Sequence, residues 1–254
     1  AKNGVKEILL IAQDLSYYGI DIYGKGQLGE LINKISEVDG IEWIRLHYLY
    51  PTKFPMDILP IMRENPKVCK YLDFPLQHIS NRVLKNMLRH VTREETEALI
   101  AKIKEEVPGV VIRTTMLVGF PGETQEDFDE LKAFIQETKF ERLGVFPYSK
   151  EEGTYAGDNF EDSLDDEVKQ NRANEIMEVQ QYISAELNQQ KIGKEYKVII
   201  DSTDGEFVVG RTEFDSPEVD GEVLISTDTE LQKGDMVTVK VTGAEDYDLY
   251  GSLV

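Results

Sequence analysis

The chain has 254 residues, 41% of them hydrophobic, which is enough for one large core or for a medium domain plus a small one. No apolar run of about 18 residues and no basic-then-apolar leader is present, so we expect a cytoplasmic protein without a membrane span. The single cysteine, Cys69, excludes an internal disulfide, and the net charge of −20 disfavours free nucleic acid and favours basic protein partners.

Five apolar runs of strand length alternate with helical patterns in the first part of the chain. Strands are predicted over residues 6–12, 43–49, 70–76, 110–118 and 141–148, and helices near residues 27–38, 56–64, 80–88, 93–107 and 124–138. Ser80 and Thr92 are candidate helix caps, Glu95 completes a capping box with Thr92, and Asp127 places an acid in the first turn after Thr124. This alternation predicts parallel strands with crossover helices, in a barrel or an open sheet.

A long helix predicted over about residues 164–190 leads into a different pattern. After Lys191, short strands alternate with turn residues over residues 195–201, 205–213, 221–226, 235–244 and 247–254. That spacing favours a small antiparallel barrel. We therefore expect two domains: an α/β domain with its connector helix over residues 1–190, and an all-β domain over residues 191–254.

Polar loops that contain glycine or proline follow four of the five predicted strands. Gln13 follows the first strand, Gln77 the third, the segment GFPGE at residues 119–123 the fourth, and Tyr148 with Ser149 the fifth. The carboxyl ends of parallel strands meet on one rim, where loops build the binding sites of such folds. Each loop is weak evidence alone, but four of them together predict a site on this rim.

Four sequence blocks resemble, in order, those of the methylthiotransferase family of radical S-adenosylmethionine (SAM) enzymes. The blocks are EILLIAQDLSYYG, YLDFPLQHISNRVLKNMLR, LVGFPGETQEDF and YSKEEGTYA, and the last domain, with GRTEFDSPEVDG, resembles the family's TRAM domain. QHIS and FDSPEVDG are similar to the branch that modifies an aspartate of a ribosomal protein; the transfer-RNA branch typically has Ser-Gly after that glutamine. The resemblance implies a partial (β/α), TIM-like radical-SAM barrel followed by a small OB-like antiparallel barrel.

The resemblance also implies that SAM lies along the strand tips, beside a [4Fe–4S] cluster. The cofactor-binding residues that it implies here are Gln13, Gln77, Arg113, Gly119, Pro121, Gly122, Tyr148 and Ser149. Gly119 and Gly122 let the backbone approach or turn where a Cβ would collide, so Gly119→Val is expected to weaken SAM binding and leave the fold largely intact. Arg113 fits an ordinary strand-edge arginine equally well, and Glu123 fits a first-turn acid better than a ligand.

The family pattern is incomplete in this chain. The family holds its cluster with C-x-x-x-C-x-x-C after the first barrel strand, and Cys69 alone cannot replace three thiolates. The first strand here matches the family's second, and the chain starts with Ala1 rather than Met. We therefore expect an inactive fragment without catalytic or metal-binding residues of its own, whose [4Fe–4S] clusters are held by cysteines outside this chain.

Acidic residues in the last quarter of the chain indicate the partner. Residues 194–254 hold 15 acidic and 5 basic residues, a net charge of −10, and Glu218, Asp220 and Glu222 would share one face of an extended segment. We expect this patch to dock a basic small-subunit ribosomal protein. The resemblance implies an electron donor as a further partner. Two alternatives stay open: a transfer-RNA adenosine methylthiotransferase of the same family, and a non-catalytic acidic scaffold that binds basic proteins.

Overall fold

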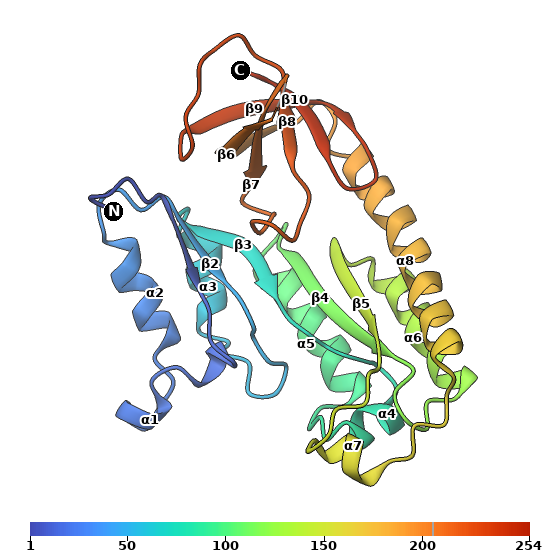
Figure 1. Cartoon of the computed structure of the whole chain (residues 1–254). Helices are drawn as coiled ribbons and strands as arrows, with labels where there is room; N and C mark the ends of the chain where they lie inside the picture. Colours follow the sequence, from blue (N-terminus) through green and yellow to red (C-terminus); the bar gives the residue numbers. More distant parts are fainter. Residues whose placement is uncertain (205) are drawn as a thin grey trace.

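Two β-structures joined by one long helix make up the protein (Figure 1). The computed structural model describes residues 1–204 and 206–254. The first β-structure is a sheet of five parallel strands in the order β1-β2-β3-β4-β5. The strands are β1 Glu7–Leu10, β2 Trp43–Leu46, β3 Val68–Asp73, β4 Val111–Val118 and β5 Arg142–Pro147. The prediction of an α/β domain with parallel strands is therefore confirmed.

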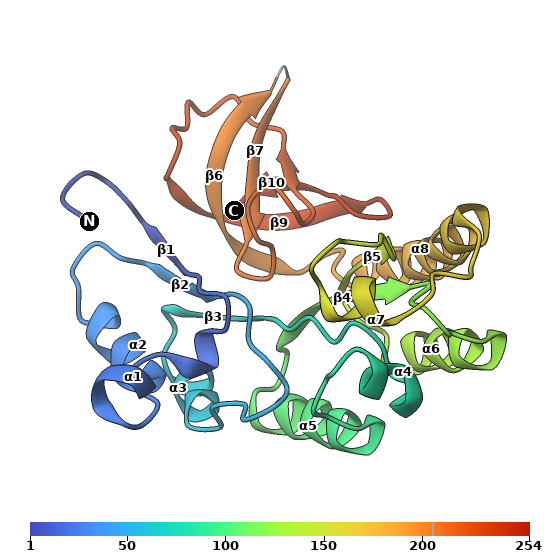
Figure 2. The same ribbon diagram turned by 60° about the horizontal axis from the view of Figure 1, so that its bottom comes forward.

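Helices cover one face of this sheet, called the outer face below (Figure 2). The helical segments are η1 Leu15–Tyr17, α1 Ile20–Tyr23, α2 Leu28–Ser36, α3 Ile58–Glu64, α4 Asn81–Asn86, α5 Arg93–Glu106, α6 Gln125–Thr138, α7 Tyr155–Asn159 and α8 Asp166–Gln189. Alternate strand residues such as Ile44, Leu72 and Ile112 share one buried cluster with apolar helix residues. The intervening residues therefore lie on the opposite face, called the inner face.

Side-chain hydrogen bonds cap the starts of α5 and α6, but not the start of α4. Thr92 and Glu95 form the predicted capping box at the start of α5, and Thr124 and Asp127 form another at α6. Ser80 stands at the N-cap of α4 but makes no capping hydrogen bond. Its hydroxyl instead donates to the carboxylate of Asp127 at 2.6 Å, a charge-assisted bond that is stronger than a bond to a neutral amide. Ser80 therefore occupies the predicted N-cap position, but its side chain does not cap α4.

After α8 the chain forms a closed five-stranded barrel in the order β10-β8-β7-β6-β9. Its strands are β6 Glu195–Asp204, β7 Phe207–Thr212, β8 Val223–Ile225, β9 Met236–Ala244 and β10 Leu249–Leu253. Four strand pairs are antiparallel, as expected, but β10 and β8 are parallel. Gly205, where one predicted strand begins, lies outside the described residues. A separate apolar cluster that includes Val198, Ile225 and Val239 fills this small barrel.

The small barrel packs on the inner face of the sheet, at the end where the parallel strands begin (Figures 1 and 2). Trp43, Tyr71 and Val111 of the inner face form one apolar cluster with Phe214 and Met236 of the small barrel. The helices therefore bury one face of the sheet, and the small barrel covers part of the other.

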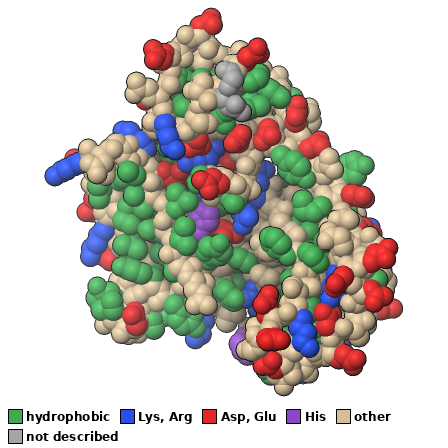
Figure 3. All heavy atoms as spheres, viewed as in Figure 1, with side chains coloured by type: hydrophobic (Ala, Val, Ile, Leu, Met, Phe, Trp, Pro, Cys, Tyr) green, Lys and Arg blue, Asp and Glu red, His purple; other side chains and the backbone are tan. Residues whose placement is uncertain are grey.

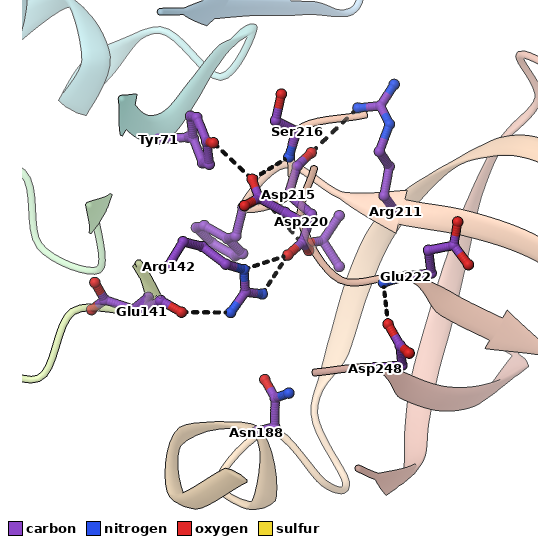
Figure 4. Close-up of polar contacts among 12 residues, drawn as sticks. Tyr71, Glu141, Arg142, Asn188, Arg211, Asp215, Ser216, Asp220, Glu222 and Asp248 are labelled. Atoms are coloured by element: carbon purple, nitrogen blue, oxygen red, sulfur yellow. Dashed lines mark hydrogen bonds and ion pairs between the residues drawn. The ribbon is translucent and has the colours of Figure 1, made fainter. Parts of the chain in front are cut away.

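The loop between β7 and β8, residues 213–222, makes several polar contacts of this interface and is called the docking loop (Figure 4). The guanidinium of Arg142 pairs with the buried carboxylate of Asp215, with Nε at 3.1 Å from Oδ1. Asp220 accepts a hydrogen bond from the Tyr71 hydroxyl at 2.7 Å and lies 3.4 Å from Arg113 Nε. Charged groups of both domains thus neutralise each other within the interface.

We expect Asp215→Ala to lower the free energy of unfolding by about 3–5 kcal/mol, because the Arg142 charge would stay buried without its partner. Urea denaturation at neutral pH measures this, with Glu218→Ala, an exposed site on the same loop, as the control. Burial raises the pKa of Asp215, but Arg142 and Lys191 bring it below its ordinary value. The stabilisation that the Asp215 carboxylate gives the wild type over Asp215→Ala is therefore complete above about pH 4, and it shrinks as the pH falls further. Equal denaturation midpoints for the two variants would contradict this role.

Candidate functional site

The loops after the parallel strands lie at the end of the sheet away from the small barrel, near α1, α4 and α7 (Figure 1). Gln13 is exposed after β1, and Gln77 is half-buried after β3. Tyr148 and Ser149 follow β5. Because β1 and β5 are the two edges of the sheet, the rim has Gln13 at one end and Tyr148 at the other, with Gln77 between them.

Gln77 is held in a conformation that few side-chain-bearing residues adopt. Its φ is +71°, in the left-handed region, where a Cβ is strained. The backbone N–H of Gln77 donates to Thr115 O at 2.8 Å, and its carbonyl accepts from Leu117 N–H at 2.7 Å. Strain of this kind persists where the surroundings over-determine it, often at binding sites. The contacts with β4 therefore fix the backbone of Gln77, and with it the direction in which the side chain starts from the rim.

The turn after β4 is closed by the side chain of Glu123. This buried carboxylate accepts the Gly119 N–H at 2.9 Å and pairs with Arg172 of α8 at 2.5 Å, and His78 Nε2 lies 3.4 Å away. Since α6 begins only at Gln125, the expectation that Glu123 is a first-turn helix acid is wrong. Glu123 holds the turn against α8 and has its charge balanced within the chain.

Gly119 is required by its backbone and by its neighbour in α8. Its φ is +73°, and a Cβ built there would lie 2.4 Å from Lys169 Cγ. The expectation that Gly119→Val leaves the fold largely intact is therefore wrong, because the side chain would collide with a helix. Pro121 in the same turn is buried, and Gly122 is exposed with a φ of +81°.

Comparing Gly119→Ala with Gly122→Ala separates this collision from backbone strain. Both glycines have a positive φ, but a Cβ at Gly122 would meet only Arg82 Nη1, at 3.9 Å. We expect Gly122→Ala to cost about 1–2 kcal/mol of folding free energy from its left-handed backbone. Gly119→Ala should cost about 1–3 kcal/mol more because of overpacking against Lys169. Urea titrations of the two variants measure the difference. Equal costs would show that Lys169 of α8 moves aside without a loss of folding free energy.

Tyr148 is a mostly buried residue with an unsatisfied hydroxyl. Its ring packs edge-on against Phe120, with centroids 5.3 Å apart, and shares a cluster with Val83. Burial raises the pKa of Tyr148, and among the described residues its hydroxyl has no hydrogen-bond partner. With the exposed Ser149 and with Lys169 of α8, it lines a cavity of about 410 Å³. These two residues are thus next to space that a ligand could enter.

Arg113 does not reach the rim. It is the third residue of β4, and its guanidinium lies 3.1 Å from Asp73 and 3.4 Å from Asp220. Both carboxylates belong to this chain, and one of them comes from the docking loop. The structure therefore places Arg113 in the interface between the two β-structures, apart from the other residues expected to bind the cofactor.

The three acids expected to dock a partner do not form one exposed face. Glu218 and Glu222 are exposed, but the Asp220 side chain is only 3% exposed because Tyr71 and Arg113 bind it. The segment is not extended, since Glu218 has a φ of +68°. The expectation is wrong for Asp220, whose carboxylate contacts Arg113 and Tyr71 inside the molecule.

Polar residues on the inner face were not singled out from the sequence. Asp73, 1% exposed, contacts Arg113, and its Oδ2 lies 3.5 Å from His47 Nδ1. His47 Nε2 in turn lies 3.1 Å from the Ser216 hydroxyl of the docking loop. The sequence did contain a signal for them: Arg45 of β2 and His47, just after it, alternate with apolar residues, and this pattern places both side chains on the inner face.

The described residues do not fit an iron–sulfur cluster. Burial raises the pKa of the Cys69 thiol to about 12, so this side chain is not a ready thiolate ligand. No group of three or more His, Cys, Asp or Glu side chains within residues 1–204 and 206–254 is arranged to hold a metal ion. Any cluster that serves the rim needs ligands other than these.

We expect the chain as given to stay colourless after anaerobic treatment with iron and sulfide, because it supplies one buried thiol. Visible absorption and iron content measure this, and Cys69→Ala should behave identically. A longer form with the cysteines of the family motif should turn brown under the same conditions. One cluster bound per short chain would overturn this interpretation.

Two family models match the chain: one described as "Radical SAM superfamily" over residues 1–135, and one described as "TRAM domain" over residues 192–254. A protein named "Ribosomal protein uS12 methylthiotransferase RimO" from Phocaeicola vulgatus is 55% identical over 99% of this chain and 58% of its own length. The protein of that name from Christiangramia forsetii is 57% identical over 99% of this chain and 56% of its own length. The chain thus spans less than two thirds of these relatives.

Among solved structures, the radical SAM enzyme coproporphyrinogen III oxidase (HemN) of Escherichia coli aligns with a TM-score of 0.50 at 17% identity. The alignment covers 61% of this chain and 37% of that protein, and at this identity it supports the fold alone. In the part of the chain that the structure describes, no helix is both long and apolar enough to cross a membrane.

Proposed function

Because the chain belongs to the radical SAM superfamily, we propose that the whole protein adds a methylthio group to the β-carbon of an aspartate in ribosomal protein uS12. The observation that carries this proposal is the identity of 55–57% over 99% of the chain with proteins named for that activity. In this proposal, residues 1–190 form the radical SAM part and residues 191–254 the TRAM domain.

The cofactor proposed for the rim is SAM, which when bound supplies the reactive adenosyl group. Gln77, fixed by its contacts with β4, presents a side-chain amide that can hydrogen-bond ribose or carboxylate. Gln13 offers the same chemistry at the β1 end of the rim. Gly119, Pro121 and Gly122 shape the turn after β4, and Tyr148 and Ser149 border the open space beside β5. The [4Fe–4S] clusters that the family implies are proposed to be held by cysteines outside this chain.

The proposed partners are uS12 as a basic protein and an electron donor, and a ribosomal substrate implies a cytoplasmic location. Acidic side chains are prominent over the small barrel and over the side of α6 and α8 (Figure 3). A net charge of −20 attracts a basic protein and repels free RNA. This charge and the names of the relatives favour uS12 over transfer RNA as the substrate.

The test uses the full-length, reconstituted protein with SAM, a reductant, and either uS12 in small ribosomal subunits or transfer RNA. Mass spectrometry should find one methylthio group on an aspartate-containing peptide of uS12 and none on the RNA. Modification of transfer RNA alone would move the protein to the other branch of the family. Absence of any SAM-dependent product, with the cluster present, would favour a binding protein.

Charge reversal of Glu218 and Glu222 to Lys should slow association with uS12 and flatten its salt dependence, because exposed charges act mainly on encounter. Stopped-flow binding at low and moderate salt measures both effects. The matched control reverses Glu37 and Glu137, which are exposed outside the small barrel, and so changes the net charge equally. The same slowing in the control would assign the effect to net charge rather than to the docking loop.

A further inference from the structure

A cavity of about 360 Å³ lies where β5, α8 and two loops of the small barrel meet, and the proposed chemistry at the rim does not use it. It extends from Gly144 of β5 to Gln180 and Ser184 of α8, and Val219 and Tyr247 border it from the small barrel. Both parts of the chain are therefore needed to form it.

The floor of the cavity has unsatisfied hydrogen-bonding groups. Gln180 and Ser184 are each 1% exposed, and within the described residues Gln180 Oε1 and Ser184 Oγ have no hydrogen-bond partner. Gln180 Nε2 donates to the Phe140 carbonyl at 2.9 Å, so the free atom of this amide is its acceptor oxygen. A buried acceptor without a donor is unfavourable. The cavity therefore calls for a molecule that brings hydrogen-bond donors.

Gly144 keeps the cavity open. A Cβ built on it would meet no heavy atom within 4 Å, and its φ is outside the left-handed region. Neither the backbone nor the packing thus requires glycine at this position. Glycine inside a strand weakens the strand and often marks a place where a ligand approaches closely.

The charges around the cavity favour a cationic donor. The two arginines in its wall are already paired, Arg113 with Asp73 and Asp220, and Arg142 with Asp215. Two further carboxylates in the wall, those of Glu141 and Asp248, accept backbone N–H groups. Neither of these two carboxylates forms an ion pair with another described residue. Figure 4 shows Glu141 beside Arg142, and Asp248 beyond the docking loop.

The mouth of the cavity is apolar. Val219 is 57% exposed and Tyr247 is 42% exposed, and Met177 of α8 is half-buried beside them in the wall. Lysine and arginine side chains lay their methylene stems on apolar surface, and their charged heads donate several hydrogen bonds. The apolar mouth of the cavity matches the stem of such a side chain, and the acceptor-rich floor matches its head.

We propose that this cavity binds a lysine or arginine side chain of uS12, with its stem between Val219 and Tyr247 and its head group donating to Gln180 and Ser184. The identity of the partner rests on the proposed function. The chemistry of the occupant, a cationic donor on an aliphatic stem, rests on the cavity alone.

The test fills the cavity in the full-length protein with Gly144→Leu, since a Cβ at Gly144 would meet no heavy atom within 4 Å. We expect binding of uS12, measured by calorimetry, to weaken about tenfold through loss of a charge-assisted contact. Gly26→Leu is the matched control, since a Cβ at Gly26 also meets nothing within 4 Å and its φ is also ordinary. Free agmatine, a guanidinium on an aliphatic chain, is the second probe and should bind the wild type but not Gly144→Leu.

A second pair of variants guards against misfolding. Tyr247→Ala should weaken uS12 binding several-fold, whereas Tyr182→Ala, at a residue of α8 that is 78% exposed, should leave it unchanged. Wild-type affinity for uS12 in both Gly144→Leu and Tyr247→Ala would overturn the proposal, as would a cavity that holds water only, with no agmatine bound. If the wild type binds agmatine but not uS12, the proposed function fails and the cationic site stands.

Discussion

The buried ion pair between Arg142 and Asp215 is the contact on which the arrangement of the two β-structures depends. Arg142 is the first residue of β5, and Asp215 belongs to the docking loop of the small barrel. Removing both charges from water is costly, and the Thr212 hydroxyl, which donates to Asp215 at 2.6 Å, helps to offset that cost. Since Asp215 is the ion-pair partner of the buried Arg142 guanidinium, the pair favours one placement of the loop over alternatives that leave Arg142 unpaired.

That placement also decides what the inner face of the sheet can do. The docking loop binds Tyr71 and Arg113 through Asp220, and it reaches His47 through Ser216. Arg113 and His47 in turn contact the same buried carboxylate, Asp73, which ends β3 just before the rim loops. A displacement of the loop would therefore leave polar groups of the inner face without partners, so the docking loop completes the polar contacts of the inner face.

Local patterns in the sequence predicted the elements, whereas long-range contacts decided the roles of individual residues. The parallel strands and the capping boxes of α5 and α6 follow from periodicity and from residues three positions apart. Asp215 lies in the acidic last quarter of the chain from which a partner surface was predicted, yet its own partner, Arg142, lies 73 residues earlier. The collision of Gly119 with Lys169 likewise joins residues of different elements, and no short stretch of sequence contains both.

The distribution of unsatisfied polar groups separates structural sites from open ones. Among the described residues, the buried charged groups with a free polar atom, such as Arg172 and Arg211, already form ion pairs. His78 Nε2, which is also free of hydrogen bonds among the described residues, lies 3.4 Å from the Glu123 carboxylate. Three neutral side chains with a free polar atom line cavities instead: Tyr148 lines the cavity beside β5 at the rim, and Gln180 and Ser184 line the cavity below the docking loop. Since folding selects against unpaired buried groups, their location in two cavities indicates that ligand or water completes both sites.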